Sequence, residues 1–474
     1  MNFFKKYSWL NFESYLQLLI LFIPVLLITG PFLPDFFLTT VSLSFIFFVF
    51  FKKKMHLFFN KIFLFFLIFT VICIISSFFS DYKKTSLITS LGYIRFGVFI
   101  IAIKFLINQK NNFIKNLYQI LFIIFIVLFF DSLLQKFTGF NIFGWQPPYS
   151  RITSFFHNDI KLGGYILRFT PLLIALAIYN KKKNNIILFI LILSLIMTLL
   201  SGERTAFFLN LLFFVIYIFI SNLKNIVKLF LVFFTIIFLS IVILLNPTLK
   251  VRLYENLNNQ LNFLKKEAFY DEKIIDQNGV KRAVHRDSTV IPRVYIMYFD
   301  TSIKIWNDNF YIGSGPRTYQ FKSSELKYLT QSDHAGFIAY RDKINKKIEG
   351  IEKPHRPDFK NKIDELSWKK GLGFQEGHYE GFTNINGINS HPHHIYLQLL
   401  SETGIFGCLV IFILFIFCFL KIFSNIHIYF KCIILSIVIN LFPLSLSGNF
   451  FNNWLSILFF FPIGFLFIKN SNKI

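Results

Sequence analysis

Three histidines stand close together in a stretch that reads Ser-His-Pro-His-His from Ser390 to His394. An imidazole has an unperturbed pKa near 6.5, so at neutral pH it can take a proton from a hydroxyl group. Closely spaced histidines also suit zinc and similar ions. Here Pro392 fixes the backbone between two of them, and no His-Glu-x-x-His arrangement or third ligand at a set spacing accompanies them. The stretch therefore favours one histidine acting as a general base over a metal site, with a structural histidine turn as the alternative.

Two arginines stand in short motifs that suit an anionic substrate. Arg204 lies in Ser-Gly-Glu-Arg-Thr between two apolar runs, and Arg293 opens an amphipathic segment that leads to Gly313-Ser-Gly-Pro-Arg317. A guanidinium stays charged at any working pH and presents a rigid fork of donors that matches phosphate oxygens. Arg204 has two structural alternatives, which are to pair with Glu203 or to lie among lipid head groups. The glycine pair lacks the Gly-Lys-Ser/Thr ending of a phosphate-binding loop, so we interpret it as a turn.

These groups must be positioned by a chain that is mostly apolar. Of its 474 residues, 54% are hydrophobic and 16% are charged, and the mean hydropathy is +0.56. Such a composition is typical of a polytopic membrane protein and not of a soluble domain. The net charge of +24 comes mostly from lysines in short connections between apolar runs, where lysine sets membrane topology. This distribution removes most of the case for nucleic-acid binding as the reason for the positive charge.

Twelve apolar runs are candidates for membrane-spanning helices, since about 20 apolar residues cross the hydrocarbon core. They cover 14–30, 33–51, 57–79, 86–107, 113–134, 161–179, 186–200, 206–220, 229–245, 395–420, 427–446 and 450–468. The polar segment 246–394 separates the ninth run from the tenth and holds 18 of the 25 acidic residues. The sequence predicts an all-α polytopic membrane protein, with nine helices in 1–245, a large loop in 246–394 and three helices in 395–474.

Lysine placement predicts the orientation of these helices. If the N-terminus is cytoplasmic, every connection on that side carries lysine, whereas the short connections on the other side are poor in lysine. The positive-inside rule then places the segment 246–394 outside the cytoplasm. Two further connections on the same face carry arginine, namely 135–159 with Arg151 and 201–205 with Arg204. We expect one site to be assembled from these three connections.

Three charged residues, Arg95, Asp131 and Arg168, interrupt apolar runs. A charge near the bilayer centre costs about 2.5–3.5 kcal/mol on insertion scales, so such residues usually face a protein interior or a cavity. They predict either a structural ion pair, such as Arg95 with Asp131, or a polar cavity that receives an anionic lipid head group.

Within the large segment, apolar residues at helical spacing predict helices at about 251–266 and 291–306. The stretches 271–287 and 323–386 are polar excursions, and much of the second is predicted to be loop. The four cysteines all lie in apolar runs, and we interpret them as packing residues.

Taken together, these motifs resemble the O-antigen ligase family, whose members share a Wzy-type core with the O-antigen polymerases. The resemblance rests on Arg151, the Ser-Gly-x-Arg-Thr hairpin, Arg293 about twenty residues before Ile312-Gly-Ser-Gly, and His-Pro-His-x-x-Tyr-Leu-Gln-x-x-x-Glu-Thr-Gly-Ile-x-Gly. It covers roughly 151–407 together with the twelve-span plan. Family members usually have asparagine where this chain has His394, so His393 is the match to the catalytic histidine.

The resemblance implies a GT-C-like glycosyltransferase that is multi-pass in the bacterial inner membrane, with its active site facing the periplasm. Such enzymes move a glycan from an undecaprenyl pyrophosphate carrier to a sugar hydroxyl of lipid A–core and invert the anomeric carbon without a metal or other cofactor. By this resemblance His393 is the general base, and Arg204 and Arg293 compensate the charge that grows on the leaving pyrophosphate. The expected substrate-binding residues are Arg151, Arg168 and His391. The expected partners are the lipid-linked glycan, the lipid A–core acceptor and membrane lipids, without nucleic acid.

Other functions fit parts of the same pattern. A Wzy-type polymerase, which extends the carrier-linked glycan, and a protein O-oligosaccharyltransferase share these motifs with the ligase. A twelve-span transporter fits the helix number, but transporters tend to place binding groups near the midplane of repeated halves. No repeat relates the two halves here, and the predicted charges gather at one face.

Overall fold

The computed structural model describes residues 3–110, 112–148, 151–221, 223–245, 269–275, 281–287, 293–329 and 387–468. Within this part of the chain, each of the twelve predicted apolar runs contains a helix. Before the large segment these are α1 (Phe3–Leu26), α2 (Phe32–Phe51), α3 (Lys61–Phe79), α4 (Lys83–Gln109), α5 (Phe113–Thr138), α6 (Leu162–Tyr179), α7 (Asn184–Leu200), α8 (Arg204–Ile220) and α9 (Asn225–Leu245). After it come α17 (Ile395–Ile422), α18 (Ile428–Asn440) and α19 (Asn453–Ile463), the last followed by a 3₁₀ turn, Gly464–Phe467.

The helices confirm a multi-pass membrane protein. Six of the described helices, α2 to α6 and α17, are long and apolar enough to cross a membrane. Large apolar side chains such as Phe47, Phe78 and Phe137 stay exposed on these helices. A helix satisfies its own backbone hydrogen bonds, which is required in lipid, so such faces are suited to contact acyl chains. Helices α7, α8 and α18 are shorter, so the count of twelve crossings stays a prediction.

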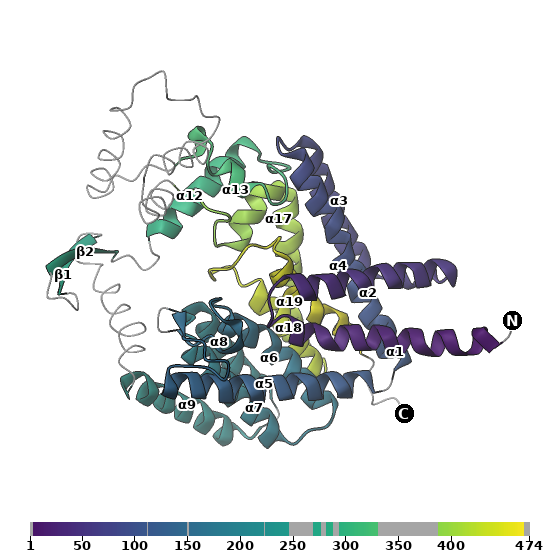
Figure 1. Ribbon diagram of the computed structural model, residues 1–474, viewed down its shortest axis with the longest axis horizontal. Coiled ribbons are helices and arrows are strands. Elements are labelled where there is room, and N and C mark those ends of the chain that lie inside the picture. The colour runs from purple at the N-terminus through teal and green to yellow at the C-terminus, as the bar shows by residue number, and fades with distance from the viewer. Residues whose placement is uncertain are drawn as a thin grey trace.

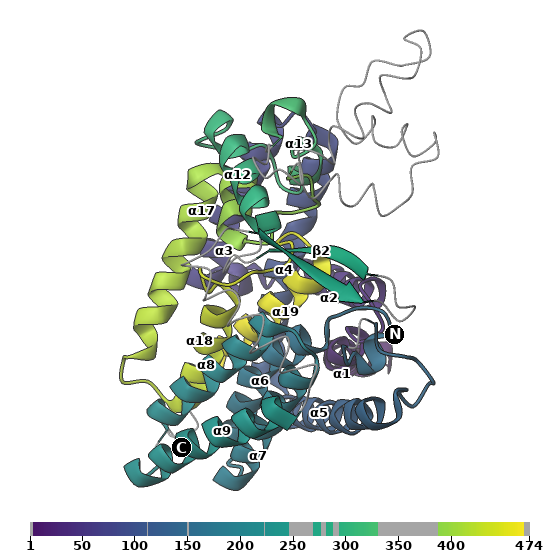
Figure 2. The same cartoon turned by 90° about the vertical axis from the view of Figure 1, so that its left-hand side faces the viewer.

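Helix α6 is the centre of this bundle. It packs against α5, α7, α8, α18 and α19, and Figure 2 shows it among these helices. Its residues from Leu162 to Ala177 are buried, except for Arg168, which is partly exposed. The sequence therefore places a charged side chain on the most enclosed helix of the bundle.

The large segment contains a pair of strands and several helices. Strands β1 (Phe269–Ile275) and β2 (Lys281–Asp287) pair antiparallel, with Tyr270 opposite Arg286. The polar excursion expected over 271–287 therefore contains a β-hairpin, which was not predicted. Helix α12 (Arg293–Asp308) lies at the predicted 291–306, and α13 (Tyr319–Lys322) and a 3₁₀ turn (Leu326–Tyr328) follow it. The predicted helix at 251–266 and most of the predicted loop at 323–386 lie outside the described residues.

The large segment contacts the membrane helices at a break in α17. Gly404 has φ +67°, in the left-handed region, and interrupts the helix. The freed backbone pairs with the Gly-Ser-Gly turn, since Ser314 N donates to Ser401 O at 2.9 Å and Gly315 N donates to Glu402 O at 2.8 Å. A Cβ on Gly313 would lie 2.4 Å from the backbone of Glu402. Figure 1 shows α12 and α13 lying against α17 as a result.

The charged residues in the apolar runs do not pair as expected. Arg95 Nη2 lies 2.7 Å from Asp35 Oδ1, and Asn453 donates to the other oxygen of Asp35 at 3.1 Å. Asp131 instead accepts from the backbone of Ile142 at 2.9 Å and from a serine hydroxyl. The predicted Arg95–Asp131 pair is therefore wrong, because α5 turns Asp131 toward its own following connection.

Candidate functional site

A cavity of about 1010 Å³ lies where the connections of one face meet. Its walls include Pro31 before α2, Arg151 and Lys161 before α6, the α7–α8 connection at 202–203, the histidine turn at 390–393, and 445–452 between α18 and α19. The three connections expected to form one site, 135–159, 201–205 and 246–394, all contribute to it. The α3–α4 connection contacts the large segment, because the side chain of Asp81 pairs with Lys322 of α13 at 2.5 Å.

The cavity is strongly cationic. Its lining includes five basic side chains, Arg151, Lys161, Arg168, Arg204 and Arg317, and one carboxylate, Glu203. The charges of Arg151 and Arg204 lie close enough to repel each other. Like charges held together in a partly dry space favour an anionic ligand that spans them.

Glu203 connects the arginines to the start of α6. Its carboxylate accepts hydrogen bonds from the backbone N–H groups of Gly163 at 2.6 Å and Gly164 at 3.1 Å, at the positive end of the helix dipole. A Cβ on Gly163 would lie 3.0 Å from this carboxylate, so glycine permits the approach. Burial raises the pKa of Glu203 to about 7, although these two amides and the charge of Arg168 act in the opposite direction. Arg204 is not the hydrogen-bond partner of Glu203 in the described structure, so that structural alternative does not hold.

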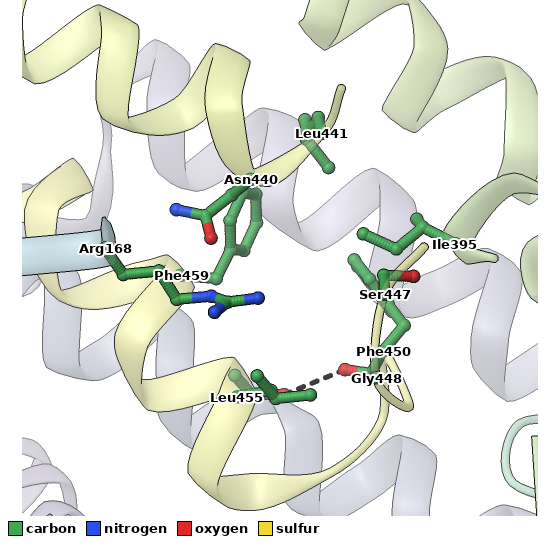
Figure 3. A pocket seen from close by; sticks show the side chains of 10 residues that line it. Arg168, Ile395, Asn440, Leu441, Ser447, Gly448, Phe450, Leu455 and Phe459 are labelled. Carbon is green, nitrogen blue, oxygen red and sulfur yellow. Dashed lines mark hydrogen bonds between the residues drawn. The ribbon is translucent and has the colours of Figure 1, made fainter. Parts of the chain in front are cut away.

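Arg168 reaches from α6 toward α18 and α19. Figure 3 shows its guanidinium in a space bordered by Asn440, Ser447 and Leu455. This smaller cavity, of about 30 Å³, shares these residues with the large one. One guanidinium nitrogen of Arg168 donates to Gly164 O at 3.0 Å, which leaves other donors for a ligand.

His393 lies in the wall of the cavity, between α12 and the loop before α19. Its ring is 5.2 Å from the ring of Tyr295 and 5.8 Å from that of Tyr298, and its carbonyl accepts from Ser447 N at 2.8 Å. Its φ is +57°, a left-handed conformation that costs about 1–2 kcal/mol for a residue with a Cβ. Strain of this kind is often held at functional sites.

Asn389 determines which nitrogen of His393 carries a lone pair. Asn389 Oδ1 accepts from Ser390 N at 2.6 Å, so its other side-chain atom is the NH₂ group. That group lies 3.2 Å from His393 Nε2 and donates to it. The arrangement therefore puts the ring proton on Nδ1 and leaves Nε2 able to accept a proton.

The two neighbouring histidines are used differently. His394 caps α17, with Nδ1 accepting from Leu397 N at 3.3 Å and Nε2 donating to the carbonyl of Pro443 at 2.8 Å. Both of its ring nitrogens are held by backbone groups, and it does not line the cavity. His391 lines the cavity 4.1 Å from the ring of His393, and its Nδ1 meets Ser390 Oγ at 2.9 Å.

Burial keeps these histidines neutral. It lowers the pKa of His391 to about 3, with a smaller contribution from His393, and it also lowers the pKa of His393. A neutral imidazole is the form that can accept a proton. The lowered pKa of His393 therefore favours this form.

Five of the six predicted site residues line this cavity, namely Arg151, Arg168, Arg204, His391 and His393. Arg293 is the first residue of α12, and Tyr295, two residues further, is part of the cavity wall. Sequence reasoning missed three residues of the site. Glu203 accepts hydrogen bonds from the α6 amides, Asn389 is the partner of His393, and Arg317 lies in the cavity wall. A signal existed for Asn389, which stands four residues before His393, but none distinguished it from the other asparagines nearby.

Metal binding finds no support in the described residues, where no three His, Cys, Asp or Glu side chains gather as a ligand set. The cavity offers instead one carboxylate and several guanidinium groups, which suit an anion.

Comparison with models of known protein families gives a match. A family model described as O-antigen ligase matches residues 189–342, and no curated protein matches the chain. The matched segment contains Arg204, Arg293 and the Gly-Ser-Gly turn, and it ends before the histidine stretch. Members of this family are glycosyltransferase-like enzymes. The match confirms, over residues 189–342, the resemblance of this chain to the O-antigen ligase family.

Proposed function

We propose that this protein is an O-antigen ligase, which transfers a glycan from undecaprenyl pyrophosphate to a sugar hydroxyl of lipid A–core at the periplasmic face of the inner membrane. The observation that carries the proposal is the position of His393, a neutral base, in the wall of a cavity that also contains Arg151, Arg168 and Arg204. A base and a set of cations in one cavity are what an anionic leaving group and a hydroxyl nucleophile require.

In the proposed reaction, the acceptor hydroxyl takes the place of the Asn389 amide at Nε2 of His393. The O–H bond breaks and its proton passes to Nε2, while the acceptor oxygen forms a bond to the anomeric carbon. The bond from that carbon to the phosphate oxygen breaks, and its electron pair stays on the pyrophosphate. His393 then returns the proton to water, and undecaprenyl pyrophosphate leaves.

The arginines act on the leaving group in this scheme. As the sugar–phosphate bond breaks, negative charge grows on the pyrophosphate, and guanidinium groups already in place stabilise it without reorganising. Arg204 and Arg151 repel each other in the free protein, and this repulsion is relieved when an anion binds between them. Attack from the side opposite the leaving group inverts the anomeric carbon.

Complementation separates ligase from polymerase. The wild-type gene would be placed in one bacterial host that lacks its O-antigen ligase and in another that lacks its polymerase, with the native glycan supplied in both. We expect glycan on lipid A–core in the ligase-deficient host, with consumption of the carrier-linked pool. Longer carrier-linked chains in the polymerase-deficient host alone would instead assign the polymerase reaction.

A further inference from the structure

Arg317 has a backbone conformation that its side chain disfavours. Its φ is +63°, in the left-handed region where the Cβ crowds the following carbonyl oxygen and glycine is preferred. It follows the Gly-Ser-Gly turn, in which Gly313 and Gly315 also have positive φ. An arginine at such a position needs a reason, either in packing or in ligand binding.

The contacts that hold the turn involve the backbone of Arg317 and not its side chain. The carboxylate of Glu402 accepts from Tyr319 N at 2.8 Å and from the backbone N–H groups of Arg317 and Thr318. On the other side, a Cβ on Gly315 would lie 2.6 Å from Ser86 Oγ, so the turn is wedged against the α3–α4 hairpin. These contacts hold the main chain whatever side chain stands at 317.

The side chain of Arg317 lies in the wall of the cavity. It is exposed, and in the described part of the chain its guanidinium forms no ion pair and no side-chain hydrogen bond. It stands with Gln320 and Ser390 on the wall formed by the large segment, whereas Arg168 belongs to α6 and Arg204 to α8. The cavity thus has cations on both walls.

We propose that Arg317 contacts the pyrophosphate of the lipid carrier from the wall formed by the large segment. The inference rests on the proposed function and adds a residue to it. A pyrophosphate presents oxygens on two phosphorus centres, so cations on two walls can hold it from both sides, and a guanidinium fixed at its backbone loses little freedom on binding. The strained conformation of Arg317 is the means by which the turn directs this group into the cavity.

The test is the affinity of the full-length protein in detergent for undecaprenyl pyrophosphate. Arg317→Gly removes the cation and relieves the backbone, so the variant should melt no lower than wild type yet bind about tenfold or more weakly, as expected for a lost charge-assisted hydrogen bond. Arg317→Asn is a second variant, since asparagine tolerates the left-handed region and carries no charge. The matched control is Lys181→Gly, at φ +52° after α6, which relieves the same strain away from the cavity and should bind as wild type does.

Arg204→Ala separates the inference from the proposed function. If Arg204→Ala weakens binding and both Arg317 variants bind as wild type does, the role of Arg317 is overturned and the proposed function stands. If neither position affects binding, the pyrophosphate site itself is wrong, and the role of Arg317 falls with it.

Discussion

The break in α17 and the cavity beside α6 and α8 are both polar regions in an apolar helical body, but they treat their polar groups in opposite ways. At the break, the carboxylate of Glu402 is fully buried and accepts hydrogen bonds from Tyr319 N and from the side chain of Gln398. In the cavity, Arg151 Nε and His391 Nε2 are buried without a hydrogen-bond partner among the described residues.

This difference indicates what each region is for. A buried polar atom without a partner costs about 1–3 kcal/mol, so most such atoms are paired in folded proteins. At the break the polar groups form their hydrogen bonds within the protein, so the Glu-Thr-Gly motif there stabilises the fold. In the cavity some donors have no hydrogen-bond partner among the described residues, so these residues are suited to bind a ligand.

The largest effect is expected from breaking the first region. Glu402→Ala removes the acceptor for the backbone N–H groups of Tyr319, Thr318 and Arg317, so the free energy of unfolding should fall by roughly 3 kcal/mol or more. Thermal melting and monodispersity in detergent measure this loss. Glu402→Gln keeps the shape of the side chain and one acceptor oxygen, and its melting temperature should lie between those of wild type and Glu402→Ala. A Glu402→Ala protein that melts as wild type does would remove the contrast between the regions.

Breaking the second region should abolish activity without unfolding the protein. His393→Ala removes the general base, and glycan transfer should fall about 10²- to 10⁴-fold while the melting temperature stays close to wild type. The neighbouring His394→Ala is the matched control, because it loses the cap of α17 and should cost about 0.5–2 kcal/mol of stability but little activity. The reverse outcome, with activity lost only in His394→Ala, would assign the base to the other histidine.

A smaller effect sharpens the role of the base. Wild-type activity should be present above the pKa of His393, which burial lowers below its usual value, and should be lost as the pH falls through it. Asn389→Asp places a carboxylate beside Nε2, which stabilises the protonated ring and should raise the pKa of His393. The acid limb of the pH–rate profile should therefore move to higher pH. Asn389→Ala, which adds no charge, should leave the limb closer to its original place.

Much of the helical plan could be predicted from sequence, because long apolar runs leave the chain few alternatives in a membrane. The grouping of Arg151, Arg204 and His393 also followed from topology, since their connections were expected on one face. The β1–β2 hairpin was missed because its polar composition resembles that of a loop. The partner of Arg95 was missed because α2 and α5 both offer an aspartate, and only packing decides that Asp35 is the nearer one.

The finer geometry of the site follows from the fold and not from the sequence pattern. The tautomer of His393 depends on the side-chain orientation of Asn389, and that orientation depends on one backbone N–H, at Ser390. The left-handed backbone at Arg317 depends on Glu402, which lies far along the chain. The first arrangement lies within one turn, but only its folded geometry selects Asn389 among the asparagines nearby. The second joins a turn to a distant side chain, which no local sequence pattern encodes.

The most direct test of the central claim is a single-turnover assay with purified protein, undecaprenyl pyrophosphate carrying the native glycan, and lipid A–core. Both glycan on the acceptor and free undecaprenyl pyrophosphate would be followed in wild type and in His393→Ala. The proposed function predicts that wild type forms the two products together, and that His393→Ala binds the carrier but forms neither at a comparable rate. Transfer by His393→Ala at the wild-type rate would contradict it.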